Sequence, residues 1–146
     1  MTSVVATVGS CTRDTPGMDE LDATVRRRLQ SDEIAWLTTV RPDGTPHVTP
    51  VWFVVDRSTW WVGCNATSVK VRNCRTQPAV ALALDGGRAP VVAEGVATVL
   101  TCGFPAGVVA LFDRKYGWDV EADDGSGPRA LIEVAATRWL FRGTAR

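Results

Sequence analysis

The sequence predicts one mainly β domain of about seven strands, joined mostly by antiparallel hairpins, with about three helices beside them. Short runs rich in β-branched and aromatic residues alternate with turn signals built from Gly, Pro and Asp. Only three segments have the spacing of apolar residues that is typical of a helix. At 146 residues, with 45% hydrophobic residues and no internal repeat, the chain has the size and the apolar content of a single domain with a packed core.

The N-terminal part divides into an arm and a helix. Residues 1–18 are rich in Thr, Ser, Gly and Pro and are predicted to form a mobile arm, so the domain proper covers residues 19–146. Asp19–Gln30 is predicted to be a helix, because Leu21, Val25 and Leu29 recur at four-residue steps. We expect this helix to pack as a lid. The arginines at its end, Arg26, Arg27 and Arg28, are expected to form a solvated face, with a basic docking surface as the alternative.

The remaining elements follow in order, each bounded by a turn or capping signal. The first hairpin turns through Pro42 and Gly44, the second through Asp56-Arg57-Ser58, and a third turn is Asp85-Gly86-Gly87. The predicted strands are Ile34–Val40, His47–Val55, Thr59–Asn65, Ala79–Leu84, Pro90–Leu100, Arg129–Ala135 and Arg138–Phe141. Two further helices are predicted, one from Thr67 or Ser68 to just before Pro78 and one over Ala106–Tyr116 with Gly117 as its C-cap.

Pro50 lies in the middle of the second predicted strand. Proline has no N–H to give to a ladder and is normally confined to sheet edges or bulges. We therefore expect an interruption at Pro50, where the backbone groups of Thr49 and Val51 are free to face a flat heterocyclic ligand. The alternative is that Pro50 only trims an edge strand. Trp52 and Val54 share one face of this strand, and Phe53 and Val55 share the other. Both faces are largely apolar, so one is expected to line the barrel core and the other to meet a ligand or a partner subunit.

Lys70 falls in the first turn of the second predicted helix. A cation is unfavourable there by roughly 0.3–1 kcal/mol at an exposed site, because it faces the positive end of the helix dipole. The cost reverses if an anion is bound, since free first-turn N–H groups and a lysine form a phosphate site. Arg72, Asn73 and Arg75 lie close by, and a solvated basic helix face is the alternative. Together with Pro50, this segment suggests a planar cofactor that carries a phosphate.

The composition argues against several other classes. Sixteen basic and sixteen acidic residues balance, so no nucleic-acid partner is expected. Cys11, Cys64, Cys74 and Cys102 have no C-x-x-C spacing, and His47 is the only histidine, so no metal site is expected. Cys64 is interpreted as a small buried hydrophobe and His47 as structural rather than catalytic. Without a signal peptide or a membrane span, a cytoplasmic protein is expected.

Two stretches resemble a known family. V-R-P-D-G-T-P-H-V-T-P-V-W-F and S-V-K-V-R-N-C-R-T-Q-P-A-V-A-L are similar to the split β-barrel flavin and deazaflavin proteins related to pyridoxamine 5′-phosphate oxidase. The resemblance covers roughly residues 21–100 and is strongest to the actinobacterial branch that uses coenzyme F420. It implies an antiparallel split β-barrel of six to seven strands with about three peripheral helices. The small residues Ala93, Gly95 and Ala97 are then expected to close the barrel or to lie at a dimer seam.

The resemblance also implies a function. It suggests a homodimeric oxidoreductase that uses reduced F420 to transfer hydride to a small unsaturated or conjugated substrate. The alternatives are an FMN-binding oxidoreductase of the same fold and a non-catalytic carrier of a flavin, a deazaflavin or haem. The chain departs from the family at Ser68, where a basic residue is common, and at Cys74, where leucine is usual. The predicted cofactor-binding residues are Thr49, Pro50, Val51, Trp52, Asn65, Ser68, Lys70, Val71 and Asn73.

No catalytic triad or carboxylate pair is visible in the sequence. In a cofactor enzyme this is expected, because the cofactor carries the chemistry and the protein orients it. Thr49 is the possible donor beside the ring. The segment from Trp118 to Pro128, with its acidic residues and glycines, is predicted to be a mobile loop that gates a substrate pocket.

Overall fold

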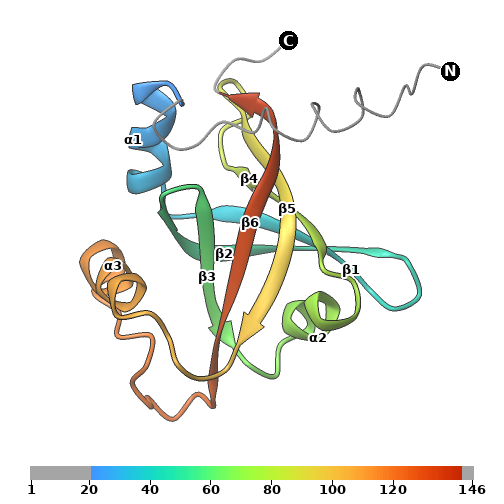
Figure 1. The fold of residues 1–146 in the computed structure, drawn as a ribbon, viewed down its shortest axis with the longest axis vertical. Coiled ribbons are helices and arrows are strands. Elements are labelled where there is room, and N and C mark those ends of the chain that lie inside the picture. The colour runs from blue at the N-terminus through green and yellow to red at the C-terminus, as the bar shows by residue number, and fades with distance from the viewer. Residues whose placement is uncertain (1–20, 143–146) are drawn as a thin grey trace, which may run out of the picture.

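A computed structural model describes residues 21–142 and shows a six-stranded antiparallel barrel with three helices outside it (Figure 1). The predicted arm over residues 1–18 lies outside the described residues. The barrel is closed in the strand order β1-β2-β3-β6-β5-β4. The elements are α1 (Ala23–Ser31), β1 (Ala35–Val40), β2 (Pro46–Asp56), β3 (Thr59–Asn65), α2 (Val69–Thr76), β4 (Ala79–Leu84), β5 (Val91–Leu100), α3 (Ala106–Tyr116) and β6 (Arg129–Arg142).

The last strand differs from the prediction. In place of two short strands, β6 is one strand of 14 residues that pairs with both β3 and β5. Its pairing with β5 shifts register between Val92 and Ala93 and again between Glu94 and Gly95. These bulges bend the sheet and let one long strand close the barrel, which a reading of local turn signals does not reveal.

The barrel interior holds the main core. It is filled by side chains at alternate positions of the strands, as the period of two requires. Phe53 and Trp60 are among its largest fully buried members, and their ring centroids lie 5.1 Å apart. Trp61 points the other way, into a second cluster beneath α3 with Val108 and Phe112. Trp60 and Trp61 therefore lie on opposite faces of β3.

The first helix begins later than predicted. Asp22 is its N-cap, and its side chain accepts a hydrogen bond of 2.7 Å from the N–H of Thr24. Residues 19 and 20, at the predicted start, lie outside the described part. Val25 and Leu29 are buried in the main core, so α1 packs on the barrel as expected.

Arg28 differs from the solvated side chain that was expected. It pairs with Asp32 at 3.0 Å and donates to the carbonyl groups of Asp85 and Ala89. Arg28 therefore ties α1 to the β4–β5 turn rather than facing solvent.

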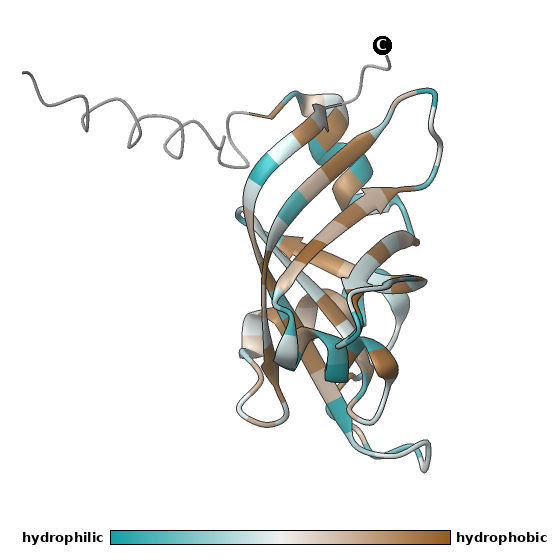
Figure 2. Cartoon of the chain, turned by 90° about the vertical axis from the view of Figure 1, so that its right-hand side faces the viewer, coloured by the Kyte–Doolittle hydropathy of each residue, from teal (hydrophilic) through white to brown (hydrophobic). Residues whose placement is uncertain are grey.

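The other two helices cover different sides of the barrel (Figure 1). α2 contacts β1 and β5, and α3 contacts β2. Gly117 ends α3 in the left-handed conformation, with φ 62°, as its predicted role as a C-cap requires. In Figure 2 the strands carry much of the apolar colour, whereas the connecting turns are mostly pale or polar.

Candidate functional site

The pairing of β2 changes near Pro50, but only on one side of the strand. Its register with β1 runs without a shift from Val40↔Pro46 to Ala35↔Val51, with Pro50 opposite Trp36. On the other side, pairing with β3 begins only at Trp52↔Gly63. The interruption predicted at Pro50 is therefore a break between β2 and β3, while the ladder with β1 passes through it.

The alternation of backbone groups decides which of them face this break. Tyr116 Oη accepts the N–H of Phe53 at 3.0 Å and lies 2.8 Å from the carbonyl of Glu33, just before β1. The backbone of Phe53 therefore faces the β1 side of β2. Because backbone groups alternate along a strand, Thr49 and Val51 face β1 as well. Val48, Pro50 and Trp52 face the β3 side.

This orientation corrects the expectation for Thr49 and Val51. Their N–H and C=O groups are directed toward β1, where Leu37 and Ala35 lie opposite them. The open edge of β2 instead carries the backbone groups of Val48 and the carbonyl of Pro50, which has no N–H of its own. The edge therefore offers a ligand more acceptors than donors.

The second predicted segment begins where β3 ends. Asn65 Oδ1 accepts hydrogen bonds from both the N–H and the hydroxyl of Thr67, and its Nδ2 donates to the carbonyl of Ser126. The side chain of Asn65 is thus engaged in shaping the turn into α2. It also fastens the end of the loop that was predicted as a gate.

Ser68 and Lys70 form the start of α2. Ser68 is the N-cap, but its side chain makes no capping bond, and its Oγ is shielded from solvent with only the thiol of Cys64, a weak hydrogen-bonding group, beside it among the described residues. Lys70 is half-buried and forms no ion pair within residues 21–142, and the first turn holds no acidic residue. A cation without an ion pair and a hydroxyl without a capping bond at a helix N-terminus fit a phosphate group.

Cys64 lies beneath this turn. Burial raises the pKa of its thiol, and the nearby Lys70, Ser68 hydroxyl and Arg129 oppose that rise without overcoming it. A thiol with a raised pKa is a poor nucleophile at neutral pH. The side chain is 7% exposed and belongs to the main core, as expected of a small hydrophobe.

Asn73 and Val71, both predicted to bind the cofactor, have buried side chains. The Nδ2 of Asn73 donates to Oγ1 of Thr39 at 3.0 Å, and both residues are buried. Val71 is fully buried in the core. Asn73 therefore ties α2 to β1 with its amide, and only the backbone of Val71 is left for a ligand.

The Asn73–Thr39 bond also brings the two predicted segments to the same end of the barrel. Thr39 pairs across the hairpin with His47 of β2, whose Nδ1 is shielded and has no partner among residues 21–142. The bond holds α2 beside β1, and the start of α2 follows directly on the end of β3 that is unpaired with β2. Neither described cavity, of about 350 and 420 Å³, is lined by a predicted cofactor-binding residue.

An aromatic cluster at this edge was missed by sequence reasoning. The ring of Trp52 stacks on Tyr116, and Trp118 meets Trp52 edge-on with centroids 5.6 Å apart. Trp52 is still 43% exposed, and Trp36 is 40% exposed. The four-residue spacing of Phe112 and Tyr116 in the predicted helix is the one sequence signal for this cluster. It does not indicate that the helix packs beside Trp52.

Among residues 21–142, no group of three or more His, Cys, Asp or Glu side chains is arranged to hold a metal ion. No helix in this part of the chain is long and apolar enough to cross a bilayer.

Comparisons with known proteins agree with this architecture. Residues 21–143 match the family model described as pyridoxamine 5′-phosphate oxidase. A solved structure named F420 reductase is 28% identical with a TM-score of 0.64, covering 77% of this chain and 93% of that one. A conserved hypothetical protein from Mycobacterium tuberculosis is also 28% identical, with a TM-score of 0.64 and 81% of each chain covered.

A third structure shares the fold alone. HutZ, a haem storage protein from Vibrio cholerae, has a TM-score of 0.72 but only 17% identity, covering 86% of this chain and 96% of that one. A search of curated protein sequences gave no significant match.

Proposed function

The chain belongs to the pyridoxamine 5′-phosphate oxidase family, and on that premise we propose that it is an oxidoreductase that works with reduced coenzyme F420. When bound, the coenzyme supplies a hydride for a small unsaturated or conjugated substrate. The family uses flavin-type cofactors, and an F420 reductase is among the similar structures. FMN is the alternative cofactor on the same fold.

One observation carries the proposal: beyond Gly63 the end of β3 is unpaired with β2 and leads into the start of α2, where Lys70 has no ion pair among the described residues and Ser68 makes no capping bond. Ser68 Oγ and Lys70 would hold the phosphate of the coenzyme, together with the free N–H groups of the first turn of α2. The Pro50 carbonyl and the backbone of Val48 would line the ring, with the Thr49 hydroxyl close by. The Thr49 hydroxyl lies 3.4 Å from the Pro50 carbonyl, which places it near the open edge.

The outer face of the β1–β2 hairpin supports a homodimer. Trp36, Val48 and Trp52 are each at least 40% exposed, and Trp36 lies directly opposite Pro50 in the ladder. Large apolar side chains gathered on one sheet face are typical of an interaction surface. We propose that a second copy of the chain covers this face and completes the cofactor site.

Titration of the apoprotein with F420 and, separately, with FMN tests the cofactor. Tight binding of F420 with weak binding of FMN is expected. The opposite order would favour the FMN enzyme. Binding of both without turnover of quinones or enones would favour a carrier.

A matched pair of variants tests the phosphate site. Lys70→Ala is expected to weaken F420 binding by roughly 1–3 kcal/mol, the scale of a charge-assisted hydrogen bond. Arg75→Ala is the control, because Arg75 is exposed at the far end of the same helix. Equal dissociation constants for the two variants would remove Lys70 from the site.

A further inference from the structure

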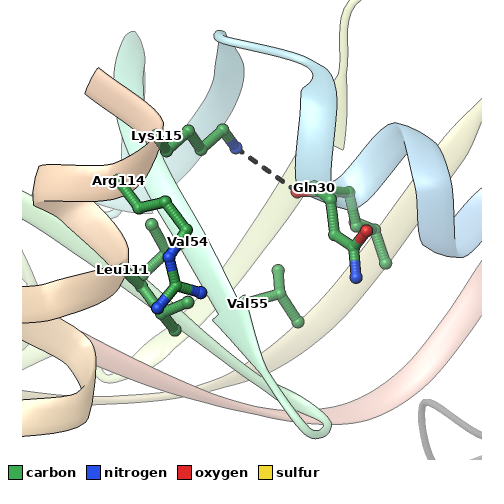
Figure 3. A pocket seen from close by; sticks show the side chains of 7 residues that line it. Gln30, Val54, Val55, Leu111, Arg114 and Lys115 are labelled. Carbon is green, nitrogen blue, oxygen red and sulfur yellow. Dashed lines mark hydrogen bonds between the residues drawn. The ribbon is translucent and has the colours of Figure 1, made fainter. Parts of the chain in front are cut away.

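A cavity lies away from the proposed cofactor site, between α1, α3 and the end of β2 (Figure 3). Its volume is about 350 Å³, at the small end of the range of ligand pockets and too small for a flavin cofactor with its side chain. It is lined by Leu29, Gln30, Val54, Val55, Leu111, Arg114 and Lys115.

The walls of the cavity are aliphatic. Leu29 and Val54 are almost completely buried, and Val55 and Leu111 are partly buried. Such walls favour a ligand with an apolar body, because its transfer from water to the cavity removes apolar surface from solvent. The polar side chains Gln30, Arg114 and Lys115 lie around this apolar space, with Gln30 and Arg114 on opposite sides of it (Figure 3).

Lys115 reaches inward from the last turn of α3. Its Nζ donates to the carbonyl groups of Phe53 at 3.0 Å and Leu29 at 3.3 Å, and it lies 3.7 Å from the centre of the Phe53 ring. Two of its three donors are thus used, and one is left for a ligand. It forms no ion pair within residues 21–142. Burial lowers its pKa to about 8, against the opposing effect of Asp32 and Glu33.

Arg114 adds a second cation. Its side chain has no hydrogen bond or ion pair to any residue that the structure describes. Figure 3 shows its guanidinium group beside Val54, facing the carboxamide of Gln30 across Val55. A basic residue near a helix C-terminus is favourable by itself, because it meets the negative end of the dipole. That effect does not account for Lys115, which is directed into a partly buried apolar space.

We propose that this cavity binds a small monocarboxylic acid with a short alkyl or aromatic tail. The tail would occupy the space between Leu29, Val54 and Leu111. The carboxylate would accept from the Arg114 guanidinium group, whose planar fork matches two carboxylate oxygens, and from the remaining donor of Lys115. This binding site is independent of the cofactor proposal.

Calorimetric titration of the full-length protein with hexanoate, hexanamide and acetate tests the site. Hexanoate is expected to bind more tightly than the other two, because hexanamide lacks the charge and acetate lacks the tail. Equal binding of hexanoate and hexanamide would overturn the proposal. Equal binding of hexanoate and acetate would also overturn it. Absence of hexanoate binding at tens of millimolar would overturn it too, because a ligand of this size is expected to bind with a dissociation constant of roughly a millimolar.

Variants at the cavity mouth sharpen the test. Arg114→Gln is expected to weaken hexanoate binding by about tenfold or more, because it removes the charge-assisted hydrogen bonds of the guanidinium group. Arg88→Gln is the control, because Arg88 is an exposed arginine in the β4–β5 turn, outside the cavity. Equal affinities for the two variants would contradict the proposal.

Nuclear magnetic resonance of the Lys115 side chain gives a readout that does not depend on folding differences between variants. A bound carboxylate is expected to raise the pKa of Lys115, because it stabilises the charged ammonium group. A Lys115 signal that titrates unchanged in saturating hexanoate would show that the acid binds elsewhere, and it would overturn the assignment.

Discussion

Trp52 and Tyr116 stack almost in parallel, with ring centroids 4.5 Å apart and an angle of 6° between the ring planes. The contact joins the strand that holds the proposed cofactor edge to the last residue of α3. The hydroxyl of Tyr116 also closes the ladder beyond β1 by bonding to the backbone of Phe53 and Glu33. One tyrosine thus fixes both the position of α3 and the exposed ring of Trp52.

Tyr116→Phe is expected to lower the free energy of unfolding by about 1–3 kcal/mol, because the N–H of Phe53 loses its acceptor. Urea denaturation measures this loss. Tyr116→Leu also removes the stacked ring and is expected to lose about 0.5–1.5 kcal/mol more. A Tyr116→Phe protein as stable as the wild type would show that the hydroxyl contributes nothing.

Asn73 is expected to act mainly through the fold. Asn73→Ala leaves the buried hydroxyl of Thr39 without its partner, at a cost of about 1–3 kcal/mol in unfolding free energy. A double-mutant cycle with Thr39→Val measures the coupling between the two side chains by denaturation. Strict additivity of the two changes would contradict the importance of this bond.

Two glycines differ in what surrounds them. A Cβ at Gly95 would lie 2.4 Å from the backbone oxygen of Ala135, whereas at Gly63 it would meet the Trp118 ring at 2.7 Å. We expect Gly95→Ala to cost about 3 kcal/mol or more and Gly63→Ala less, because a side chain yields more easily than the backbone of a paired strand. Thermal denaturation compares them, and the reverse order would contradict this account of barrel closure.

Lys115 should make stability depend on pH in the alkaline range. Its pKa is lowered from 10.5 to about 8 in the folded protein. Below pH 8 both states hold the proton. Between about 8 and 10.5 only the unfolded state does, so this lysine makes folding more favourable as pH rises. Above pH 10.5 both states have lost the proton, and this lysine no longer makes stability depend on pH.

The experiment compares wild type with Lys115→Met in urea at several pH values. From pH 8 to 10 the unfolding free energy of the wild type should rise relative to that of Lys115→Met. Cys74, whose pKa burial raises to about 11, and Tyr116, whose pKa burial raises to about 12, act in the opposite direction, and the comparison cancels them. A difference that does not change with pH would show that Lys115 keeps an ordinary pKa.

The thiols should differ sharply in reactivity. Cys102 is exposed, whereas Cys64 and Cys74 are buried with raised pKa values. Among the three cysteines within residues 21–142, iodoacetamide at pH 8 is expected to alkylate Cys102 in the native protein and Cys64 and Cys74 only after unfolding, because the thiolate is the reactive form. Peptide mass mapping assigns each site. Fast native alkylation of Cys74 would contradict its packing.

Much of the architecture could be predicted from local signals. Gly117 ends α3 because it can adopt the left-handed conformation, and Pro42 and Gly44 mark the first hairpin turn, where Gly44 has φ 88°. The apolar alternation of β2 predicted a strand with one face in the core. These features depend on neighbours in the chain, so the sequence alone determines them.

The details of the candidate site depend on contacts between distant segments. The sequence marked Pro50, but only the meeting of β2 with Tyr116 shows that Thr49 and Val51 face β1. Asn73 was predicted as a donor to the cofactor, and in the structure its amide is buried and donates to Thr39. A local pattern gives the period of a strand or helix, whereas the packing of one element on another decides which side of it is left open.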